Sequence, residues 1–281
     1  MAKVAVLMAA YNAERTIQQA VVSVLANSYP ADLFIVDDAS RVPVGEILRP
    51  LPTRTEIIRL DRNVGPAETR NIGLRLILAR NYDYVAIADA DDVCYPDRFA
   101  KQIAFLESHR DVAVVGSWVH FIDEITGETL FDLKPSADPA AVRKSMFFNI
   151  NLSHTSCMIR STTFSRVGLY SSGYPAAEDY ELMRRIAVDH DISNIPEFCM
   201  DYRISSRGIS VMRRRRQLFD RFCIQLKYFE PLEWKAWVGA ARTLVLFLIP
   251  LAVVTTSKAW LRSLVIVGRQ AVRMGPRIRR A

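Results

Sequence analysis

The chain has 281 residues, of which 50% are hydrophobic and 24% are charged, and its formal net charge is +7. This ordinary globular composition excludes a disordered, collagen-like or coiled-coil chain as an overall description. The four cysteines lie far apart and form no C-x-x-C pair, which argues against a disulfide framework or a zinc site and favours a reducing compartment. The N-terminus lacks the long apolar stretch and the small-residue cleavage site of a secretory signal.

Apolar runs alternate with helix-like segments over the first 122 residues. The sequence predicts strands at 4–9, 33–36, 56–60, 84–88 and 112–122, and helices at 14–25, 67–79 and, after Pro96, 99–109. Such alternation is typical of parallel strands joined by right-handed crossovers. We therefore predict an α/β fold with a mostly parallel sheet and helices on both of its faces.

The pattern is mixed after about residue 125. The sequence there predicts a hairpin arm at 127–133, helices at 140–148 and 178–188, and strands at 154–160 and 198–204.

Three predicted strands end in residues that suit a binding site. The first ends in Ala9-Ala10-Tyr11-Asn12, the second in Asp37-Asp38, and the fourth in Asp89-Ala90-Asp91-Asp92. In an open parallel sheet, ligands bind beyond the carboxyl ends of the strands, at the point where the strand order reverses. Neither a dinucleotide-binding G-x-G-x-x-G motif nor a phosphate-binding P-loop is present.

The fourth strand end places three carboxylates within four residues. Their mutual repulsion favours a cation or hydrogen-bond donors nearby, and carboxylate oxygens suit Mg²⁺ or Mn²⁺. The alternative is a solvated acidic turn that caps the next helix.

A second acidic pair, Glu178-Asp179, opens the predicted helix at 178–188. A carboxylate held at a helix start can point into a cleft and act as a general base, whereas the alternative is simple helix capping. The four histidines show no metal-binding spacing; His154 is the one that we single out as a possible site residue.

In their order and spacing, six segments resemble the inverting, nucleotide-sugar-dependent glycosyltransferases of family 2, which have the GT-A fold. The resemblance spans roughly residues 3–205. It is carried by VAVLMAAYNAERTIQQAVVSVLANSYP, FIVDDAS, NVGPAETRNIGL, IADADDVCYPDRFAKQI, LSHTSCMIRSTTFSRVGLY and YPAAEDYELMRRI.

The resemblance implies a role for each matching residue. The expected donor-binding residues are Ala10, Tyr11, Asp38, Arg70 and Asp89, with Asp38 accepting a hydrogen bond from the nucleotide base. Asp91, of the D-x-D motif, is the expected metal ligand. Asp179 is the expected catalytic base and Glu178 supports it. His154 and Arg203 are expected phosphate or acceptor contacts.

The implied reaction is a metal-dependent, single-displacement transfer that inverts the sugar configuration. A divalent cation, Mn²⁺ or Mg²⁺, neutralises the leaving diphosphate, and a carboxylate takes the proton of the attacking acceptor hydroxyl. Many relatives carry Y-R-x-H after the acidic helix, whereas this chain has Tyr202-Arg203-Ile204-Ser205, so Arg203 or Arg207 is the expected electrostatic substitute. The Q-x-x-R-W motif of processive polymerases is absent, which favours one transfer per encounter.

The resemblance also implies partners. They are a nucleotide-sugar donor, most commonly a UDP-sugar, and a glycan or lipid-linked acceptor in the synthesis of a cell-surface polysaccharide. Two alternatives remain open at this point, a nucleotidyltransferase and a catalytically silent nucleotide-sugar-binding protein. The first would need a glycine-rich triphosphate loop, and the second does not explain why Asp91 and Asp179 are both present.

The charge is divided along the chain. Residues 207–281 hold 16 Lys and Arg against 3 Asp and Glu, and the remainder is net acidic. We therefore expect no nucleic-acid partner. We divide the chain into a transferase domain at 1–206, with a nucleotide-binding half at 1–122 and an acceptor half at 123–206, and a basic, apolar helical region at 207–281.

The basic region suggests attachment to a membrane. The apolar run 243–256 is shorter than the roughly 20 residues that span a bilayer, and basic residues follow it to position 280. We expect this region to attach the cytoplasmic protein peripherally to the anionic inner face of the plasma membrane. Two alternatives are a helix packed on the domain and a short helical hairpin in the membrane.

Overall fold

The computed structural model describes residues 1–150, 152–204 and 213–249. Within them, one nine-stranded sheet has the order β3-β2-β1-β4-β8-β6-β9-β5, with β7 paired to β6. The strands are β1 (Val4–Ala10), β2 (Asp32–Asp37), β3 (Thr55–Arg59), β4 (Tyr84–Asp89), β5 (Val93–Cys94), β6 (Val112–Asp123), β7 (Thr129–Leu133), β8 (Met158–Arg160) and β9 (Asp191–Ile204).

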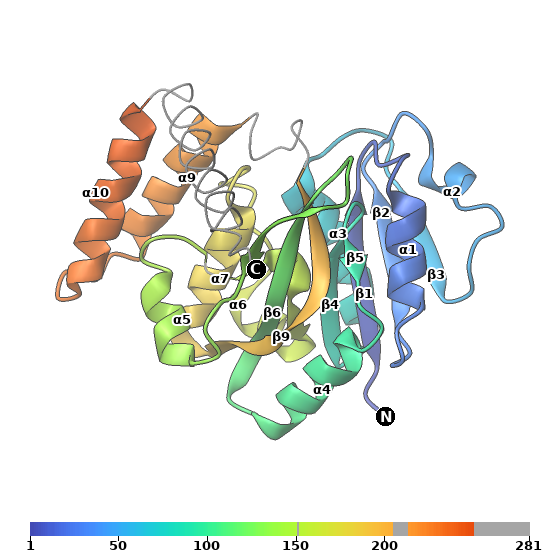
Figure 1. Cartoon of the computed structure of the whole chain (residues 1–281), viewed down its shortest axis with the longest axis horizontal. Coiled ribbons are helices and arrows are strands. Elements are labelled where there is room, and N and C mark those ends of the chain that lie inside the picture. Colours follow the sequence, from blue (N-terminus) through green and yellow to red (C-terminus); the bar gives the residue numbers. More distant parts are fainter. Residues whose placement is uncertain (151, 205–212, 250–281) are drawn as a thin grey trace, which may run out of the picture.

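Helices surround this sheet (Figure 1). They are α1 (Ile17–Leu25), α2 (Val44–Ile47), α3 (Pro66–Ala79), α4 (Arg98–Ser108), α5 (Pro139–Ser145), α6 (Ser161–Val167), α7 (Glu178–Asp189), α9 (Arg214–Lys227) and α10 (Trp234–Leu248), with the 3-10 helix η1 (His154–Ser156). The predicted α/β fold is confirmed.

Strand β1 occupies the point where the strand order reverses. It lies between β2 and β4 and is parallel to both. The chain proceeds outward from β1 through β2 to β3 and then returns to the other side of β1 as β4. In the register, Ala10 lies opposite Asp37 and Ala9 opposite Asp89. The strand ends that the sequence singles out therefore meet at one edge, where ligands bind in such sheets.

Successive residues of β1 enter two different cores, because side chains alternate across a strand. Val6 and Met8 pack among side chains of α1 and α4, and Leu7 packs among side chains of α3 and α7. Full burial of each such side chain contributes about 1.5–3 kcal/mol. The two cores hold β1 and its neighbours rigid, and hence also the polar residues at their ends.

The observed sheet differs from the predicted one in two respects. The segment 154–160 is not a continuous strand, because it begins as η1 and only Met158–Arg160 is extended. In η1, the N–H of Ser156 donates to the carbonyl of Ser153, and the hydroxyl of Ser156 donates to the same carbonyl. Strand β8 is also antiparallel to both β4 and β6, so the sheet is mixed beyond β4.

Helices α9 and α10 stand together at one side of the domain, beside α5 and α7 (Figure 1). Gln225 of α9 donates from Nε2 to the carbonyl of Phe147 at 2.8 Å, and Gly239 of α10 faces the same carbonyl. The described part of the basic region thus packs on the domain. No helix among the described residues is both long and apolar enough to cross a membrane. Of the predicted basic region 207–281, residues 207–212, with Arg207, and 250–281 lie outside the described residues.

Gly239→Ala is expected to lower the free energy of unfolding by about 1–3 kcal/mol. A Cβ atom at Gly239 would lie 1.9 Å from the Phe147 carbonyl oxygen, so α10 must move away from the domain. Gly45→Ala is the matched control, because its Cβ would lie 3.9 Å from Ile57, an ordinary contact. Urea unfolding of the two variants measures the difference, and equal midpoints would show that α10 does not pack as described.

Candidate active site

Three carboxylates form a cluster at the end of β4. Asp89, Asp91 and Asp92 each offer one oxygen, and these oxygens lie within 4.8 Å of one another. The surrounding protein atoms and the Asp89 charge raise the pKa of Asp91 to about 6, although its side chain still reaches solvent. Such crowding of like charges is relieved by a divalent cation, and oxygen ligands fit Mg²⁺ or Mn²⁺. The donor set therefore fits the expected metal.

Asp92 ties this cluster to two other parts of the chain. It is buried; its Oδ2 accepts from the Thr155 hydroxyl at 2.7 Å, and its Oδ1 accepts from the Arg203 backbone N–H at 3.1 Å. Burial and the charges of Asp91 and Asp89 raise the pKa of Asp92 well above its usual range. Asp92 thus connects η1 and β9 to the end of β4, leaving Asp89 and Asp91 as the more accessible carboxylates.

Arg70 of α3 joins the cluster to the start of α7. Its Nη2 lies 3.1 Å from Asp89 Oδ1, and its Nη1 lies 3.0 Å from Glu178 Oε1. One guanidinium therefore holds together carboxylates that are 89 positions apart in the chain. The side chain of Arg70 is only 10% exposed, so these ion pairs are shielded from solvent and weakly screened.

Both carboxylates at the start of α7 are harder to ionise than usual. Burial raises the pKa of Glu178 to about 7, against the opposing effect of Arg70. Burial likewise raises the pKa of Asp179, whose Oδ1 accepts from the Tyr180 backbone N–H at 2.7 Å. The positive charges of Arg70 and Arg221 and the negative charge of Asp89 also act on Asp179. The link that the contacts show between the start of α7 and the acidic cluster is the Arg70 bridge from Glu178 to Asp89, and the role of Asp179 as the base stays a prediction.

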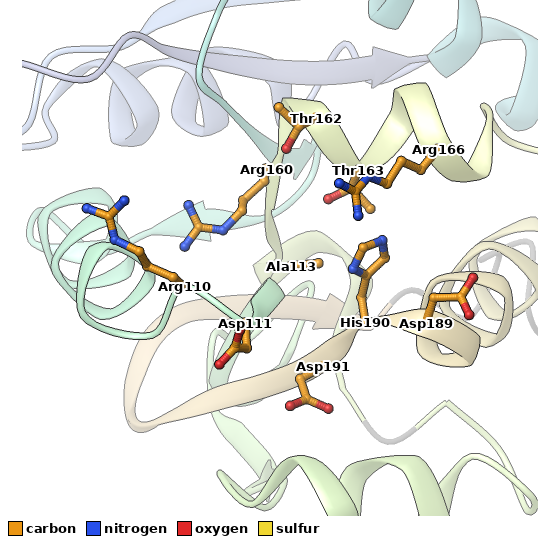
Figure 2. A pocket seen from close by; sticks show the side chains of 10 residues that line it. All are labelled: Arg110, Asp111, Ala113, Arg160, Thr162, Thr163, Arg166, Asp189, His190 and Asp191. Carbon is orange, nitrogen blue, oxygen red and sulfur yellow. The ribbon is translucent and has the colours of Figure 1, made fainter.

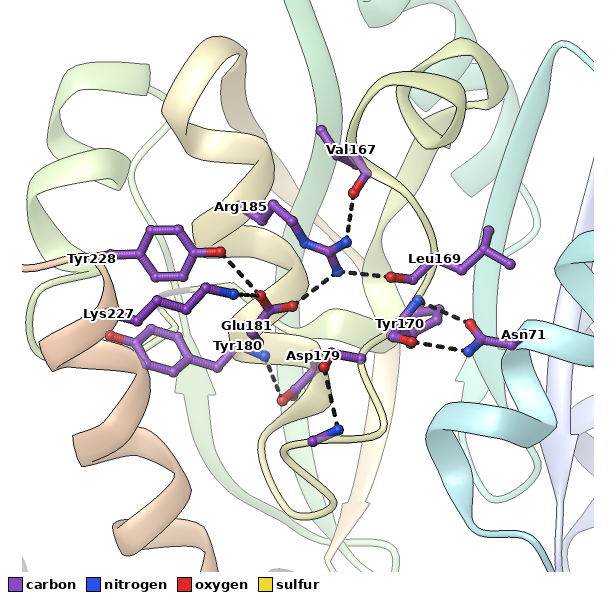
Figure 3. Close-up of polar contacts among 12 residues, drawn as sticks. Asn71, Val167, Leu169, Tyr170, Asp179, Tyr180, Glu181, Arg185, Lys227 and Tyr228 are labelled. Atoms are coloured by element: carbon purple, nitrogen blue, oxygen red, sulfur yellow. Dashed lines mark hydrogen bonds and ion pairs between the residues drawn. The ribbon is translucent and has the colours of Figure 1, made fainter.

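A buried carboxylate one turn later fixes the position of α7. Figure 3 shows Glu181 accepting from Arg185 at 2.9 Å, from Lys227 at 2.8 Å and from Tyr228 at 3.0 Å. Because Lys227 and Tyr228 belong to the end of α9, this network joins α9 to α7 and keeps the helix start of Asp179 in place.

The raised pKa of Glu178 makes stability depend on pH. A carboxyl group whose pKa rises on folding binds more protons in the folded state between its two pKa values, so stability falls as pH rises through that interval. Between about pH 4.5 and 7, the free energy of unfolding of wild type should fall by on the order of 2–3 kcal/mol relative to that of Glu178→Gln. Urea unfolding at a series of pH values without added metal measures this, and a pH-independent difference would contradict it.

The expected nucleotide-binding residues lie together at the ends of β1 and β2. The backbone N–H of Asp38 donates to the carbonyl of Ala10 at 2.9 Å. The Asp38 carboxylate accepts from the N–H groups of Val64 and Gly65 at 2.7 and 3.0 Å, which fixes it before α3. Tyr11 follows β1 and is 54% exposed. The structure therefore brings Ala10, Tyr11 and Asp38 together, and their contacts with a donor stay a prediction.

His154 and Arg203 contact different parts of the chain. His154 is buried and its Nε2 lies 2.8 Å from the Tyr170 hydroxyl. Burial and the Arg70 charge lower its pKa well below the usual range, so the ring is neutral near pH 7. Arg203 contacts Gln19 through its guanidinium, and its charge lowers the pKa of Asp91. Their contacts with phosphate or acceptor stay predictions.

The sequence analysis does not identify several residues that support the site. Asn71 holds Tyr170 by two hydrogen bonds of 2.9 Å, from its Nδ2 to the Tyr170 carbonyl and from the Tyr170 N–H to its Oδ1 (Figure 3). Asp37 is fully buried and accepts from Arg59 at 2.7 Å. Asn71 directly follows Arg70 in the T-R-N segment, so its position in the sequence could have indicated a role at the site. The ion pair of Asp37 with Arg59 depends on the pairing of their strands, which the local sequence does not reveal.

A cavity of about 370 Å³ lies away from this site, where β6 and β9 begin (Figure 2). Its lining mixes both charges, from Arg110, Asp111, Arg160, Arg166, Asp189 and Asp191, with His190, Ala113, Thr162 and Thr163. None of the predicted site residues lines it. It therefore adds nothing to the chemistry at the ends of β1 and β4.

Known proteins resemble this chain in sequence. A family model described as glycosyl transferase family 2 matches residues 5–167. An uncharacterized glycosyltransferase of Methanocaldococcus jannaschii is 31% identical over 222 residues, which cover 76% of this chain and 75% of the relative. The amylovoran biosynthesis glycosyltransferase AmsE of Erwinia amylovora is 30% identical over 230 residues, which cover 76% and 83%.

A solved structure shares the fold. The S. aureus protein TarS, as residues 1–349 in complex with UDP-GlcNAc, superposes with a TM-score of 0.65 at 15% identity, covering 86% of this chain and 71% of that one.

Proposed function

The chain belongs to glycosyltransferase family 2 and is a glycosyltransferase with the GT-A fold, and on that premise we propose that it transfers a sugar from a nucleoside diphosphate donor to an acceptor hydroxyl with inversion at the anomeric carbon. One observation carries the proposal. Arg70 joins the carboxylate that ends β4 to the carboxylate that begins α7, at 3.1 and 3.0 Å. In the proposed reaction, these ion pairs would hold the donor side and the acceptor side of the displacement in one unit.

Asp91 and Asp89 would hold the donor diphosphate through a divalent metal. The metal, Mn²⁺ or Mg²⁺, would neutralise charge on the leaving diphosphate when bound. Asp91 is the most exposed member of the cluster and would serve as the metal ligand, whereas Asp89, oriented by Arg70, would face the donor. This division follows from the hydrogen bonds that already occupy Asp92.

Asp179 would take the proton of the acceptor hydroxyl as that oxygen attacks the anomeric carbon. A hydroxyl is a poor nucleophile at neutral pH, and a positioned carboxylate of raised pKa is a better proton acceptor than an ordinary one. Glu178, paired with Arg70, keeps the start of α7 in position. The proton passes to Asp179, the new glycosidic bond forms and the bond to the diphosphate breaks, so no covalent enzyme intermediate is needed.

The donor would bind with its base against Asp38 and its ribose side near Ala10 and Tyr11. We propose a UDP-sugar, in line with the UDP-GlcNAc complex of the S. aureus protein of the same fold. His154 and Arg203 would contact phosphate or acceptor, His154 through the neutral ring beside Tyr170. The acceptor would be a glycan or a lipid-linked glycan, because the Erwinia amylovora relative is named for the biosynthesis of the polysaccharide amylovoran.

Calorimetric titration tests the donor class. UDP, GDP and dTDP are titrated into the wild-type protein with and without Mn²⁺. We expect UDP to bind, and to bind more tightly with Mn²⁺. Tighter binding of GDP or dTDP would assign the donor to a guanosine or thymidine nucleotide instead. The absence of metal-dependent binding by any nucleotide would contradict the proposed reaction.

We also propose that α9 and α10 attach the protein to the inner face of the plasma membrane, with the transferase domain at 1–206 facing the cytoplasm. Apolar side chains of these helices and their connection are exposed. They are Phe219, Leu226, Leu232, Trp234, Trp237, Val238, Leu244, Val245, Phe247 and Leu248. Four consecutive arginines, 213–216, lie at the start of α9 and next to the end of α10, where Arg214 donates to the carbonyls of Leu246 and Ile249. Exposed aromatic and aliphatic groups next to clustered arginines suit an anionic membrane surface.

Vesicle sedimentation tests this attachment. The double variant Leu232→Ala, Trp234→Ala removes side chains that are 101% and 64% exposed, and its affinity for phosphatidylglycerol-containing vesicles should fall roughly tenfold or more. Val22→Ala, 60% exposed on α1, should bind like wild type. Equal binding by wild type to neutral and anionic vesicles would contradict a role for the arginines, and equal binding by the double variant would contradict the apolar contact.

A further inference from the structure

A buried hydroxyl holds the turn that carries Asp91. This turn joins β4 to β5, and the N–H of Asp92 closes it by donating to the carbonyl of Asp89 at 3.4 Å. The Thr155 hydroxyl of η1 donates to Asp92 Oδ2 at 2.7 Å, and both residues are buried. The thioether of Met200, 3.4 Å from the same hydroxyl, is a much weaker acceptor than a carboxylate. Thr155 therefore holds the end of the turn through Asp92.

A buried arginine joins η1 to β4. Arg98, at the start of α4, is 0% exposed, and its Nη2 donates to the carbonyl of Ile87 at 2.8 Å and to that of Cys157 at 3.3 Å. The N–H of Ile87 donates to the same Cys157 carbonyl at 2.9 Å. Ile87 lies two residues before Asp89, and Cys157 lies two residues after Thr155. One guanidinium thus joins the strand that leads into the turn to the segment that follows Thr155.

Gln102, one helical turn later on α4, extends this contact to β6. It is also fully buried, and its Oε1 accepts from Arg98 Nε at 3.1 Å. Its Nε2 donates to the carbonyl of Ser156 at 2.7 Å and to that of Val115 at 3.1 Å. Because Val115 belongs to β6 and Ser156 to η1, these bonds fix η1 against a second strand of the sheet.

The charge of Arg98 makes this support costly. In the described part of the chain, its guanidinium donates to carbonyls, to Gln102 and to the Cys94 thiol at 3.1 Å, but it forms no ion pair. A buried cation without a carboxylate loses its hydration and gains no attraction in return, and at a helix start it also meets the positive end of the helix dipole. What the cation adds is a set of hydrogen bonds to separate segments, which an apolar side chain would not make.

We propose that Thr155 is a positioning residue of the metal site, which sets the place of the Asp91 carboxylate by holding Asp92. Arg98 and Gln102 support it by fixing η1. This rests on the proposed function, since it gives Thr155 a role in the binding of the cation by Asp91. A residue that orients a metal site from outside the ligand shell affects the affinity although it does not touch the ion. Without the hydroxyl, the buried Asp92 oxygen would lose its donor, and the carboxylate and the turn would move together.

Titration of Mn²⁺ followed by electron paramagnetic resonance tests this role, because the signal of free Mn²⁺ weakens when the ion is bound. The full chain is titrated with UDP present, and UDP alone is titrated in parallel, since a diphosphate also binds such ions. Thr155→Val removes the hydroxyl and keeps the branched shape, and it should weaken Mn²⁺ binding by about 10- to 100-fold. Thr155→Ser keeps the hydroxyl and should bind Mn²⁺ nearly as wild type does.

A double-mutant cycle with Asp92→Ala separates positioning through Asp92 from a general loosening of the core. In that background the Thr155 hydroxyl has no carboxylate to hold, so Thr155→Val should change the Mn²⁺ affinity by less than about twofold. An equal loss of affinity in both backgrounds would show that Thr155 acts independently of Asp92 and would overturn the proposal.

Thr163→Val is the matched control, because Thr163 is as buried as Thr155, at 3% exposed, and lines the separate cavity where β6 and β9 begin. It should bind Mn²⁺ like wild type. Wild-type affinity in Thr155→Val, or an equal loss in Thr163→Val, would overturn the positioning role and leave the proposed function standing. Failure of the wild-type protein to bind Mn²⁺ together with UDP would instead contradict the proposed function, and the positioning role with it.

Discussion

Replacing Asp179 by Asn is expected to slow sugar transfer by about 10²- to 10⁴-fold, the usual contribution of a general base. The amide has nearly the same shape but accepts no proton from the attacking hydroxyl. Asp179 is not among the residues expected to hold the nucleotide, so UDP binding should be unchanged. Release of UDP from a UDP-sugar in the presence of acceptor measures transfer, and calorimetry measures binding.

Asp189→Asn is the matched control, because Asp189 ends the same helix and is exposed. It should turn over like wild type. The raised pKa of Asp179 adds a further expectation, since the base works only when ionised. Transfer by wild type should therefore rise as pH increases through the acid range. Full activity of Asp179→Asn would remove Asp179 from the mechanism.

The sequence predicts the edge of the sheet better than the connections across it. Acidic residues after apolar runs, such as Asp38 and Asp89, mark strand ends, and parallel strands bring their carboxyl ends together. The reversal of strand order at β1 then makes neighbours of Ala9 and Asp89. The local sequence pattern is enough to predict this part of the site, because residues at the ends of neighbouring parallel strands lie next to one another in the sheet.

The contacts of Arg70 are an example of what a local sequence pattern does not predict. The resemblance assigns it to the donor pocket, whereas in the described structure its two ion pairs go to Asp89 and Glu178. Helical spacing within α3 does not indicate a partner 108 positions away. The same holds for Asp92, whose hydrogen bonds to Thr155 and Arg203 depend on how η1 and β9 fold over the end of β4.

The segment at 154–160 illustrates a local pattern overruled by side-chain contacts. Its apolar residues favour a strand, and Met158–Arg160 does form one. Thr155, however, donates to Asp92, and the hydroxyl of Ser156 donates to a carbonyl in its own turn. Serine and threonine hydroxyls compete in this way with sheet ladders, so the segment begins as a turn of 3-10 helix that delivers His154 to the interior.

Replacing Asp91 by Asn is expected to remove the metal dependence of nucleotide binding. The change deletes one charged oxygen ligand and lowers the negative charge of the cluster, so Mn²⁺ affinity should fall by at least about 10- to 100-fold, the loss typical even of residues that only support a ligand. Calorimetric titration of UDP with and without Mn²⁺ measures this directly. Transfer should fall with it, because the leaving diphosphate would lose its neutralising cation.

The fold should tolerate this change, which makes the result interpretable. Asp91 is exposed, and the surrounding protein atoms and the Asp89 charge raise its pKa to about 6, so its charged form is disfavoured without metal. Removing its charge relieves repulsion from Asp89, and the thermal midpoint without metal should stay equal or rise. Asp61→Asn, an exposed carboxylate outside the cluster, should keep metal-dependent UDP binding. If Asp91→Asn keeps it as well, the cation is held by other groups, and the cluster acts on the donor through charge alone.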